Sequence, residues 1–413
     1  MEVGTDIGND GACAGRRPPR SAGEIAAALV DAREYTLAAY AHLDAAQERF
    51  PRLREVNPPR WEIGHIGWFQ EFWCRRYRPD DPTGARTPPR LPEADRWWDS
   101  RHVPHDVRWD LPLPDWDRVH AYLAATLEDA LARLPDVPDR TFHELALYHE
   151  DMHGEALLMT LQTLALPAPP WWRSPAVAPA AVPAVDVTLD GGPAMIGAAP
   201  AEARSRFVFD NEQWSHEVRL APFAIASRPV TQGEFAAFVD DGGYLRDALW
   251  PADARAWRAR VGRTMPAYWR RDAGGFEIRR FDAWQPIDPN APMCHVCAYE
   301  AEAWCAWAGR RLPTEAEWER AALAGVVAVP GDVWEWTATA FGPYPGFTPG
   351  PYAEYSAPWF GDHRVMRGGA WATRARLVHP RFRNFYTPDR HDVFVGFRTC
   401  AAGCPWDAAM QQS

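Results

Sequence analysis

Two histidines stand four residues apart in the stretch "YHEDMHGEALLM", at His149 and His153. The stretch is apolar and free of helix breakers, which predicts a helix. Residues at i and i+4 project from adjacent turns of one helical face, so these two imidazoles could chelate one metal ion. Histidine pairs at this spacing also occur as ordinary surface or core residues. The pair alone therefore leaves both interpretations open.

A third histidine raises the case for a metal. His65 lies in the aromatic run "WEIGHIGWFQEFW", which also has a helical pattern. A bundle of helices can bring His65 against the pair on another helix. Three neutral imidazoles on one side of an ion leave positions open for substrate and O₂, which suits Fe(II). Glu155 is about 200° around the helix from His153, so we expect it to face away and favour three histidines over two histidines and a carboxylate.

The histidine pair also fits the letters of the zinc-protease pattern, because Glu150 follows His149. That pattern needs a third ligand and a protease context. The helix instead belongs to a predicted bundle, and no protease context follows it. We therefore do not expect a protease.

The composition excludes several other classes of function. The chain of 413 residues has a net charge of −11, which argues against nucleic acid or an anionic membrane as the main partner. All 44 basic residues are arginine, and the absence of lysine excludes chemistry that needs a lysine amine. Tryptophan is unusually frequent, with 22 residues, of which some must line the core and others could line a ligand pocket.

Cysteine use and hydropathy predict where the protein works. The seven cysteines do not have the spacing of a dense disulfide framework. The first residues lack the apolar segment of a signal peptide, and no apolar run approaches the roughly 18 residues that a membrane helix needs. We expect a cytoplasmic protein in a reducing compartment, with no membrane partner.

The elements that must position the histidines lie in the first part of the chain. Residues 1–21 are rich in Gly, Arg and Pro and are predicted to form a disordered tail. Residues 22–165 contain four helical patterns, with Ser21 as an N-cap of the first and Asp115 or Asp117 near the start of the third. Four helices with one long crossover predict a four-helix bundle.

The character of the sequence changes after the bundle. Residues 166–185 are rich in Pro and Ala, which is typical of a linker. Residues 186–405 are dense in Gly, Pro and Trp, with short strand-like runs and few helical patterns. We predict a compact, loop-rich α+β domain there, followed by a tail at 406–413.

Seven ordered motifs resemble the ergothioneine sulfoxide synthase family, and the resemblance runs from about residue 25 to 402. The motifs are "NPPRWEIGHIGWFQEFW", "YHEDMHGEALL", "GRRLPTEAEWERA", "GDVWEWT", "YPGFTPGPYAEYS", "RGGAWATR" and "RNFYTPDRHDVFVGFR". That family pairs a DinB-like four-helix bundle with a formylglycine-generating-enzyme-like domain of C-type-lectin-like fold. Its non-haem iron, held by three histidines, joins hercynine (trimethylhistidine) to a sulfur donor with O₂. The resemblance implies that His65, His149 and His153 hold Fe(II).

The resemblance also implies residues for catalysis and for hercynine. The family's catalytic tyrosine matches Tyr352 in "PYAEYS", with Tyr355 as the alternative, and a phenol there could donate a proton or a hydrogen atom. A structural turn tyrosine is the other interpretation. Asn384 and Phe385 match the family's pair of hercynine contacts, since an aromatic face suits a trimethylammonium group. Met152 stands where bacterial members often carry a glutamine.

The sulfur-donor pocket departs from the family pattern. Tyr386 stands two residues past Asn384, where members tend to carry an acidic residue, while Arg390 is retained. Arg101 and Arg108 lie where members place arginines for the donor's carboxylates, although solvated arginines would look the same. The C-terminal run resembles the branch that includes selenoneine synthase, which takes a selenosugar. An aromatic ring in place of a carboxylate fits a sugar donor without an amine.

The leading hypothesis is therefore an Fe(II)- and O₂-dependent enzyme that forms a carbon–selenium bond on hercynine. The first alternative is the same chemistry with cysteine or γ-glutamylcysteine. A non-catalytic carbohydrate-binding protein and a formylglycine-generating enzyme are alternatives of other classes. The latter needs a copper-binding cysteine pair, and Cys294 and Cys297, the only nearby candidates, precede a helix of the second domain and are interpreted as structural.

Overall fold

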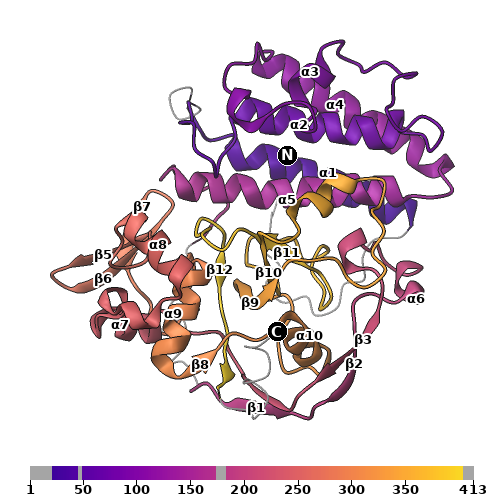
Figure 1. Ribbon diagram of the computed structural model, residues 1–413. Coiled ribbons are helices and arrows are strands. Elements are labelled where there is room, and N and C mark those ends of the chain that lie inside the picture. The colour runs from indigo at the N-terminus through magenta and orange to yellow at the C-terminus, as the bar shows by residue number, and fades with distance from the viewer. Residues whose placement is uncertain (1–20, 45–48, 174–182, 403–413) are drawn as a thin grey trace, which may run out of the picture. The chain divides into compact units, whose positions relative to one another are not determined.

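The computed structural model describes residues 21–44, 49–173 and 183–402 (Figure 1). These residues form two compact units. The first comprises residues up to 174 together with residues 205–207 and 374–377, and the second contains the rest. The predicted tails at 1–21 and 406–413 lie almost entirely outside the described residues, as does half of the predicted linker.

The first unit is helical, as the sequence predicts. Its long helices and the short helix in the crossover are α1 (Ala22–Tyr40), α2 (Pro59–Glu71), α3 (Ala94–Trp98), α4 (Trp116–Arg133) and α5 (Thr141–Thr163). Ser21 caps α1 in a capping box with Glu24, and Asp115 caps α4 through a bond from the backbone N–H of Arg118. Helix α1 packs on α5, and α2 packs on both α4 and α5.

Two features of this unit are not visible in the sequence pattern. Helix α3 is only five residues long and sits in the Pro-rich crossover, where a short turn of helix leaves no periodic signal. Helix α2 continues as the π-helix η1 (Phe72–Arg76) rather than ending. Single π-turns inside helices are frequent at functional sites because they re-aim the side chains on either side.

The second unit combines short strands and helices. Its helices are α6 (Pro200–Ala203), α7 (Gln232–Asp240), α8 (Ala252–Val261), α9 (Ala298–Ala308) and α10 (Glu315–Leu323). Its strands are β1 (Asp186–Leu189), β2 (Gly192–Ile196), β3 (His216–Leu220), β4 (Phe223–Ala226), β5 (Trp269–Asp272), β6 (Gly275–Arg280), β7 (Ala283–Pro286), β8 (Arg310–Arg311), β9 (Trp334–Ala340), β10 (Arg364–Arg367), β11 (Asn384–Tyr386), β12 (Val395–Gly396) and β13 (Cys400–Ala401).

These strands form four small sheets, with the orders β1-β4-β13-β8, β11-β10-β9-β12, β2-β3 and β5-β6-β7. The motifs "GRRLPTEAEWERA" and "GDVWEWT" contribute to the core, because Trp318, Trp334 and Trp336 are fully buried. The Trp318 indole donates to Glu335 at 2.7 Å, and Arg398 pairs with the same carboxylate. Tryptophan in this unit is therefore largely structural.

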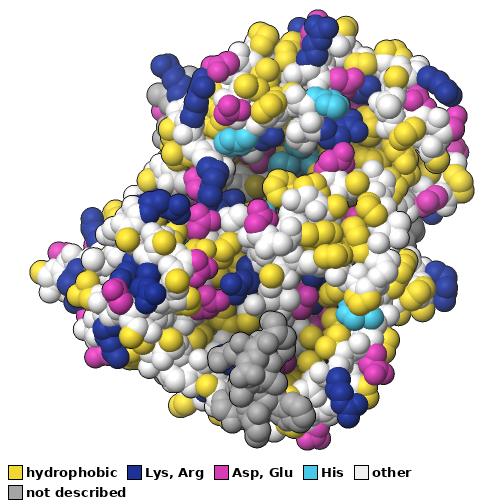
Figure 2. Space-filling model, viewed as in Figure 1, with side chains coloured by type: hydrophobic (Ala, Val, Ile, Leu, Met, Phe, Trp, Pro, Cys, Tyr) yellow, Lys and Arg dark blue, Asp and Glu magenta, His cyan; other side chains and the backbone are white. Residues whose placement is uncertain are grey.

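Charged side chains of both signs are mixed over the face drawn in Figure 2, rather than gathered by sign. None of the described helices is long and apolar enough to cross a membrane.

Candidate metal centre

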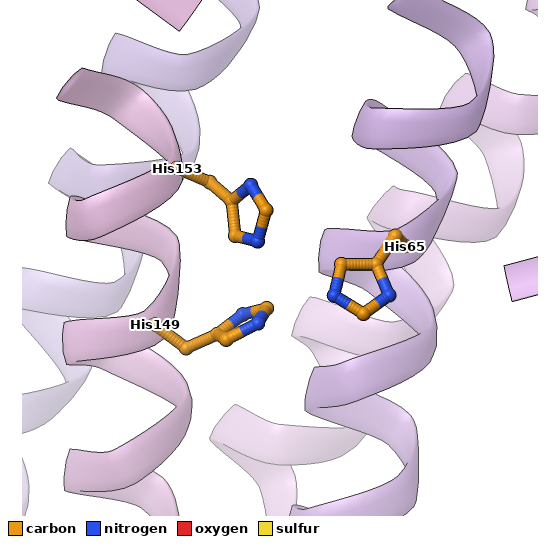
Figure 3. A group of neighbouring side chains, drawn as sticks. All are labelled: His65, His149 and His153. Carbon is orange, nitrogen blue, oxygen red and sulfur yellow. The ribbon is translucent and has the colours of Figure 1, made fainter. Parts of the chain in front are cut away.

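Two helices of the first unit bring the three predicted histidines together. Helix α2 carries His65 and α5 carries both His149 and His153, and the three rings face one another across the gap between these helices (Figure 3). One ring nitrogen of each histidine lies within 4.8 Å of one from each of the others. Among the described residues, this is the group of three potential ligands that could hold a metal ion, and Glu155 is not part of it.

Hydrogen bonds fix the orientation of two of the rings. The Nδ1 of His65 donates to the carbonyl oxygen of Trp98 at 2.7 Å. The Nδ1 of His153 donates to Oε1 of Glu62 at 2.9 Å. Each bond holds the proton on Nδ1 and leaves the Nε2 lone pair available to a metal, which is the usual arrangement around metal-binding histidines. Glu62 is buried and lies three residues before His65 on the same helix.

Aromatic rings stack on two of the three imidazoles. Trp61 stacks on His65, with centroids 4.9 Å apart and planes inclined by 8°. Phe69 stacks on His149 at 3.5 Å and 3°. Burial lowers the pKa of both His65 and His149 well below the usual value, and the neighbouring His153 lowers it further. The two imidazoles are therefore neutral, as metal ligands must be.

A glycine allows the crossover to close over the site. A Cβ placed on Gly64 would lie 2.1 Å from the indole of Trp98, whose carbonyl holds His65. No side chain larger than hydrogen fits there without displacing Trp98. The close approach of α3 to α2 thus depends on this residue.

Glu150 does not face the triad as the base of a zinc protease would. Its carboxylate is buried and pairs with Arg33 of α1, at 2.7 Å from Oε1 to Nε. Arg33 also donates to the side-chain oxygen of Gln70 on α2 at 2.9 Å. The pair ties α1, α2 and α5 together beneath the histidines. Glu150 is thus engaged by Arg33.

Arg101 and Arg108, both in the first unit, differ in the groups that their guanidinium groups contact. Arg101 forms a two-pronged ion pair with Asp99, at 2.8 and 2.7 Å. Arg108 instead donates to two neutral oxygen atoms, of Asn57 at 2.7 Å and Val103 at 3.3 Å, and lies over the Trp61 ring at 3.6 Å. Burial lowers the pKa of Arg108 to about 10, although the charge of Glu62 acts in the opposite direction. Met152 is half-buried on α5 between the two histidines.

The remaining predicted residues lie in the second unit. Asn384, on β11, accepts a bond from the backbone N–H of Phe385 at 2.8 Å, and Phe385 stacks on Phe341 at 3.9 Å. The guanidinium of Arg390 lies 4.6 Å from the centre of the Tyr386 ring. That same guanidinium forms a two-pronged ion pair with the buried carboxylate of Asp392.

The two candidate tyrosines share one turn. Tyr352 and Tyr355 stack with centroids 5.9 Å apart, and both are half-buried. Tyr355 also stacks on Phe209 at 4.4 Å. Burial raises the pKa of Tyr355 well above its usual value, and nearby Glu212 and Asp210 raise it further. The phenol of Tyr355 therefore keeps its proton throughout the physiological range.

Cys294 and Cys297 are buried free thiols, and Cys297 stands at the N-cap of α9. Burial raises the pKa of Cys297 well above the usual value. A protonated, buried thiol is a poor metal ligand and a poor nucleophile. The structural interpretation of this pair fits these properties.

Sequence reasoning did not single out Glu62 or Trp98, which orient two of the histidines. Glu62 carries a weak signal, since a carboxylate three residues before a histidine shares its helical face. Trp98 carries none, because it acts through its backbone carbonyl.

Comparison with known proteins places both units in established families. Residues 28–166 match the DinB superfamily, and residues 174–328 and 324–402 match the sulfatase-modifying factor enzyme 1-like domain. The protein is thus a DinB-like helical domain followed by a formylglycine-generating-enzyme-like, C-type-lectin-like domain, as the sequence predicts. Its helical domain carries the three facing histidines.

Full-length relatives define the family more closely. The chain is 34% identical to a hercynine oxygenase of Mycolicibacterium thermoresistibile, over 94% of this chain and 96% of that one. It is equally identical to a hercynine oxygenase of Mycobacterium tuberculosis, over 83% and 90%. A formylglycine-generating enzyme of Streptomyces coelicolor is 30% identical, over 52% and 88%. The protein belongs to the hercynine oxygenase family.

Proposed function

We propose that this protein is an Fe(II)- and O₂-dependent enzyme that joins hercynine to a selenosugar through a carbon–selenium bond. The observation that carries the metal assignment is the set of three facing imidazoles, of which His65 and His149 are buried and neutral and His65 and His153 are oriented by hydrogen bonds at Nδ1. His65, His149 and His153 would hold the iron. When bound, iron supplies positions where O₂ and a chalcogen donor can meet.

The oxidation balances without a further reductant. The C–H bond of the hercynine imidazole and the Se–H bond of the donor break, and a C–Se bond forms, which releases two electrons. O₂ accepts four electrons, so the other two come from oxidation of selenium. The products are a selenoxide and one water. A thiol donor would give a sulfoxide and one water by the same count.

The substrate contacts are proposed from the second unit. Phe385 offers an aromatic face for the trimethylammonium group of hercynine, and Asn384 offers an amide N–H₂ for its carboxylate or imidazole. Tyr352 is proposed as the proton or hydrogen donor because it matches the family's catalytic tyrosine, whereas the Tyr355 ring stacks on Phe209 and burial raises its pKa. Met152, beside the histidine pair, would contact hercynine where relatives carry a glutamine.

Replacing Tyr352 with Phe tests that assignment. The ring remains, so we expect hercynine to bind as before, while less product forms for each O₂ consumed. Oxygen consumption and product yield are measured together. Tyr355→Phe is the matched variant from the same turn. An unchanged ratio in Tyr352→Phe with a reduced ratio in Tyr355→Phe would transfer the role to Tyr355.

The proposal that the donor is a selenosugar rests on the contacts around Tyr386. Arg390 already forms an ion pair with Asp392, and the Tyr386 ring covers the flat face of the Arg390 guanidinium. An amino-acid donor brings an ammonium group, and leaving that charge without a carboxylate costs about 1–3 kcal/mol in a part-buried site. A sugar carries no such charge and can stack on the tyrosine ring.

Arg108 favours the alternative donor. Its half-buried guanidinium contacts neutral oxygen atoms and suits an anionic group. The carboxylate of cysteine or γ-glutamylcysteine would pair with it, and a sugar carries no carboxylate. The sulfoxide-forming reaction is therefore kept as the second candidate.

One experiment separates the two donors. The protein is reconstituted with Fe(II) without oxygen, then exposed to O₂ with hercynine and either a selenosugar or γ-glutamylcysteine. Products are measured by mass spectrometry. We expect turnover with the selenosugar to exceed that with γ-glutamylcysteine by roughly ten- to a hundredfold, following the charge cost above. Tyr386→Asp is expected to recover part of the activity with γ-glutamylcysteine. Equal or better use of γ-glutamylcysteine by the unchanged protein would establish the sulfur reaction instead.

A further inference from the structure

The aromatic rings that pack on the triad continue away from it in an unbroken series. His149 lies flat on Phe69, with centroids 3.5 Å apart. Phe69 contacts Trp73 at 5.9 Å, and Trp73 contacts Tyr77 at 4.7 Å. All four residues belong to α5, α2 and the segment that follows α2, within the first unit.

A second series of rings leaves the triad from His65 and reaches the same tryptophan. His65 stacks with Trp68 at 5.9 Å, and Trp68 stacks with Phe72 at 5.4 Å. Phe72 then meets Trp73 at 5.1 Å. The indole N–H of Trp68 donates to the carboxylate of Asp95 at 2.7 Å, which favours loss of an electron because the proton has an acceptor. Phe72 also contacts Tyr77, at the longer distance of 6.2 Å, so both series reach Trp73 and then Tyr77.

The types of ring in these series matter chemically. Indole and phenol lose one electron far more readily than the benzene ring of phenylalanine. Trp68, Trp73 and Tyr77 can therefore be oxidised by one electron. Phe69 and Phe72 are harder to oxidise and serve only as bridges between the other rings.

The series ends at the surface. Trp73 is buried, whereas Tyr77 is half-buried. Both residues line a surface cavity of about 550 Å³, together with Phe142 and His143. A phenol that opens on such a cavity can release its proton to water and can be reached by a small reductant.

We infer that Trp73 and Tyr77 form a one-electron transfer route. It supplies electrons toward the metal centre and so reduces oxidants there when substrate is absent. Tyr77 would give up one electron through Trp73, and bound iron would supply the O₂- or peroxide-derived oxidant that this electron reduces. The phenolic proton of Tyr77 passes to water. A thiol in solution then returns one hydrogen atom to the tyrosyl radical and becomes a thiyl radical. The inference rests on the proposed function only in taking iron as the source of the oxidant.

The experiment detects radicals on the protein's side chains rather than the product of the enzymatic reaction. Fe(II)-loaded protein, with iron content measured beforehand, is treated with hydrogen peroxide and a nitrone spin trap without hercynine or donor. Trap adducts are located by peptide mass spectrometry, and Zn(II)-loaded protein gives the background. We expect adducts at Tyr77 in the unchanged protein. Trp73→Phe is expected to reduce them at least fivefold and to move oxidation to Trp61 and Trp68. Tyr77→Phe, a milder change, is expected to shift the adducts to Trp73.

The second unit provides a matched control. Trp257 is buried like Trp73, Tyr299 is half-buried like Tyr77, and their rings are 5.6 Å apart. Neither residue belongs to the two series of rings, so Trp257→Phe and Tyr299→Phe are expected to leave the Tyr77 adducts unchanged.

Three results would overturn the inference: equal adducts at Tyr299 and Tyr77, Tyr77 adducts that persist in Trp73→Phe, or a protein that binds no iron. Adducts at Tyr77 in iron-loaded protein that does not turn over hercynine would support the route and reject the proposed function, which keeps the two hypotheses separate.

Discussion

At His153, the carboxylate of Glu62 decides which ring nitrogen is offered to a metal. The bond from Nδ1 to Oε1 is 2.9 Å long, and Glu62 is almost completely buried. A buried carboxylate strengthens the basicity of the imidazole that it contacts, and it holds the ring in one orientation. Glu62 is thus proposed as a positioning residue for the metal centre.

Replacing Glu62 with Gln tests this role with little change of shape. We expect the affinity for Fe(II) to fall about 10- to 100-fold, because a neutral amide supports the imidazole less well. Metal titration measures the effect, with His65→Ala as the reference for loss of a ligand. Glu71→Gln is the matched control: Glu71 is equally buried at the end of the same helix but bonds to Tyr122. An equal loss of affinity in both glutamine variants would assign Glu62 a general structural role.

At the scale of elements, α2 and α5 must hold their register for the rings to meet. The buried pair of Arg33 and Glu150 fixes α5 to α1, and the bond from Arg33 to Gln70 fixes α2 to both. On the other side, α3 closes over Gly64 of α2. The register of α2 is thus supported by Arg33 at Gln70 and by Trp98 at Gly64.

Gly64→Ala probes the contact between α2 and α3. The added methyl would lie 2.1 Å from the Trp98 indole, so Trp98 and its carbonyl must move away from His65. Overpacking of this kind costs about 1–3 kcal/mol, and we expect weaker Fe(II) binding together with a lower melting temperature. Gly23→Ala in α1 is the control, since a Cβ there meets nothing within 4 Å. Unchanged iron binding in Gly64→Ala would show that the Trp98 carbonyl is dispensable.

Helical periodicity could predict the elements that carry the triad, but not what orients it. The spacing of His149 and His153 and the aromatic pattern around His65 predict two helices and one shared ion. The support from Trp98 comes from a five-residue helix in a Pro-rich crossover and acts through a backbone atom, so side-chain patterns cannot reveal it. The turn of π-helix after α2 likewise leaves no mark in the periodicity of the sequence.

At the scale of the whole molecule, the first unit is not one continuous stretch of chain. Residues 374–377 belong to it although they follow most of the second unit in sequence. Arg376 in this segment donates to Asp151 of α5 at 2.8 and 2.7 Å and to Asp31 of α1 at 2.6 Å. Arg374 also pairs with Asp31, and its guanidinium lies 4.8 Å from the centre of the Tyr35 ring. Long-range ion pairs thus attach the segment to the bundle.

These ion pairs predict a pH dependence of stability. Burial acts to raise the pKa of the Asp31 carboxyl, but Arg376 and Arg374 outweigh it and hold the pKa below the usual 3.8. Because the pKa is lower in the folded than in the unfolded protein, ionised Asp31 stabilises the fold above the unfolded pKa. This contribution is lost as the pH falls through the folded pKa.

Asp31→Asn removes the charge but keeps the shape. We expect its free energy of unfolding to lie below that of the unchanged protein at pH 7, and the gap to narrow as the pH falls below about 4, where Asp31 begins to bind a proton in the unfolded chain. Urea unfolding at pH 7, 5 and 3.5 measures the gap, and Asp282→Asn, at an exposed aspartate of the second unit, provides the control. Two results would contradict this prediction: a difference in free energy of unfolding that stays constant from pH 7 to 3.5, or an equal difference in Asp282→Asn. Either would mean that the ion pairs of Arg374 and Arg376 do not hold the segment to the bundle.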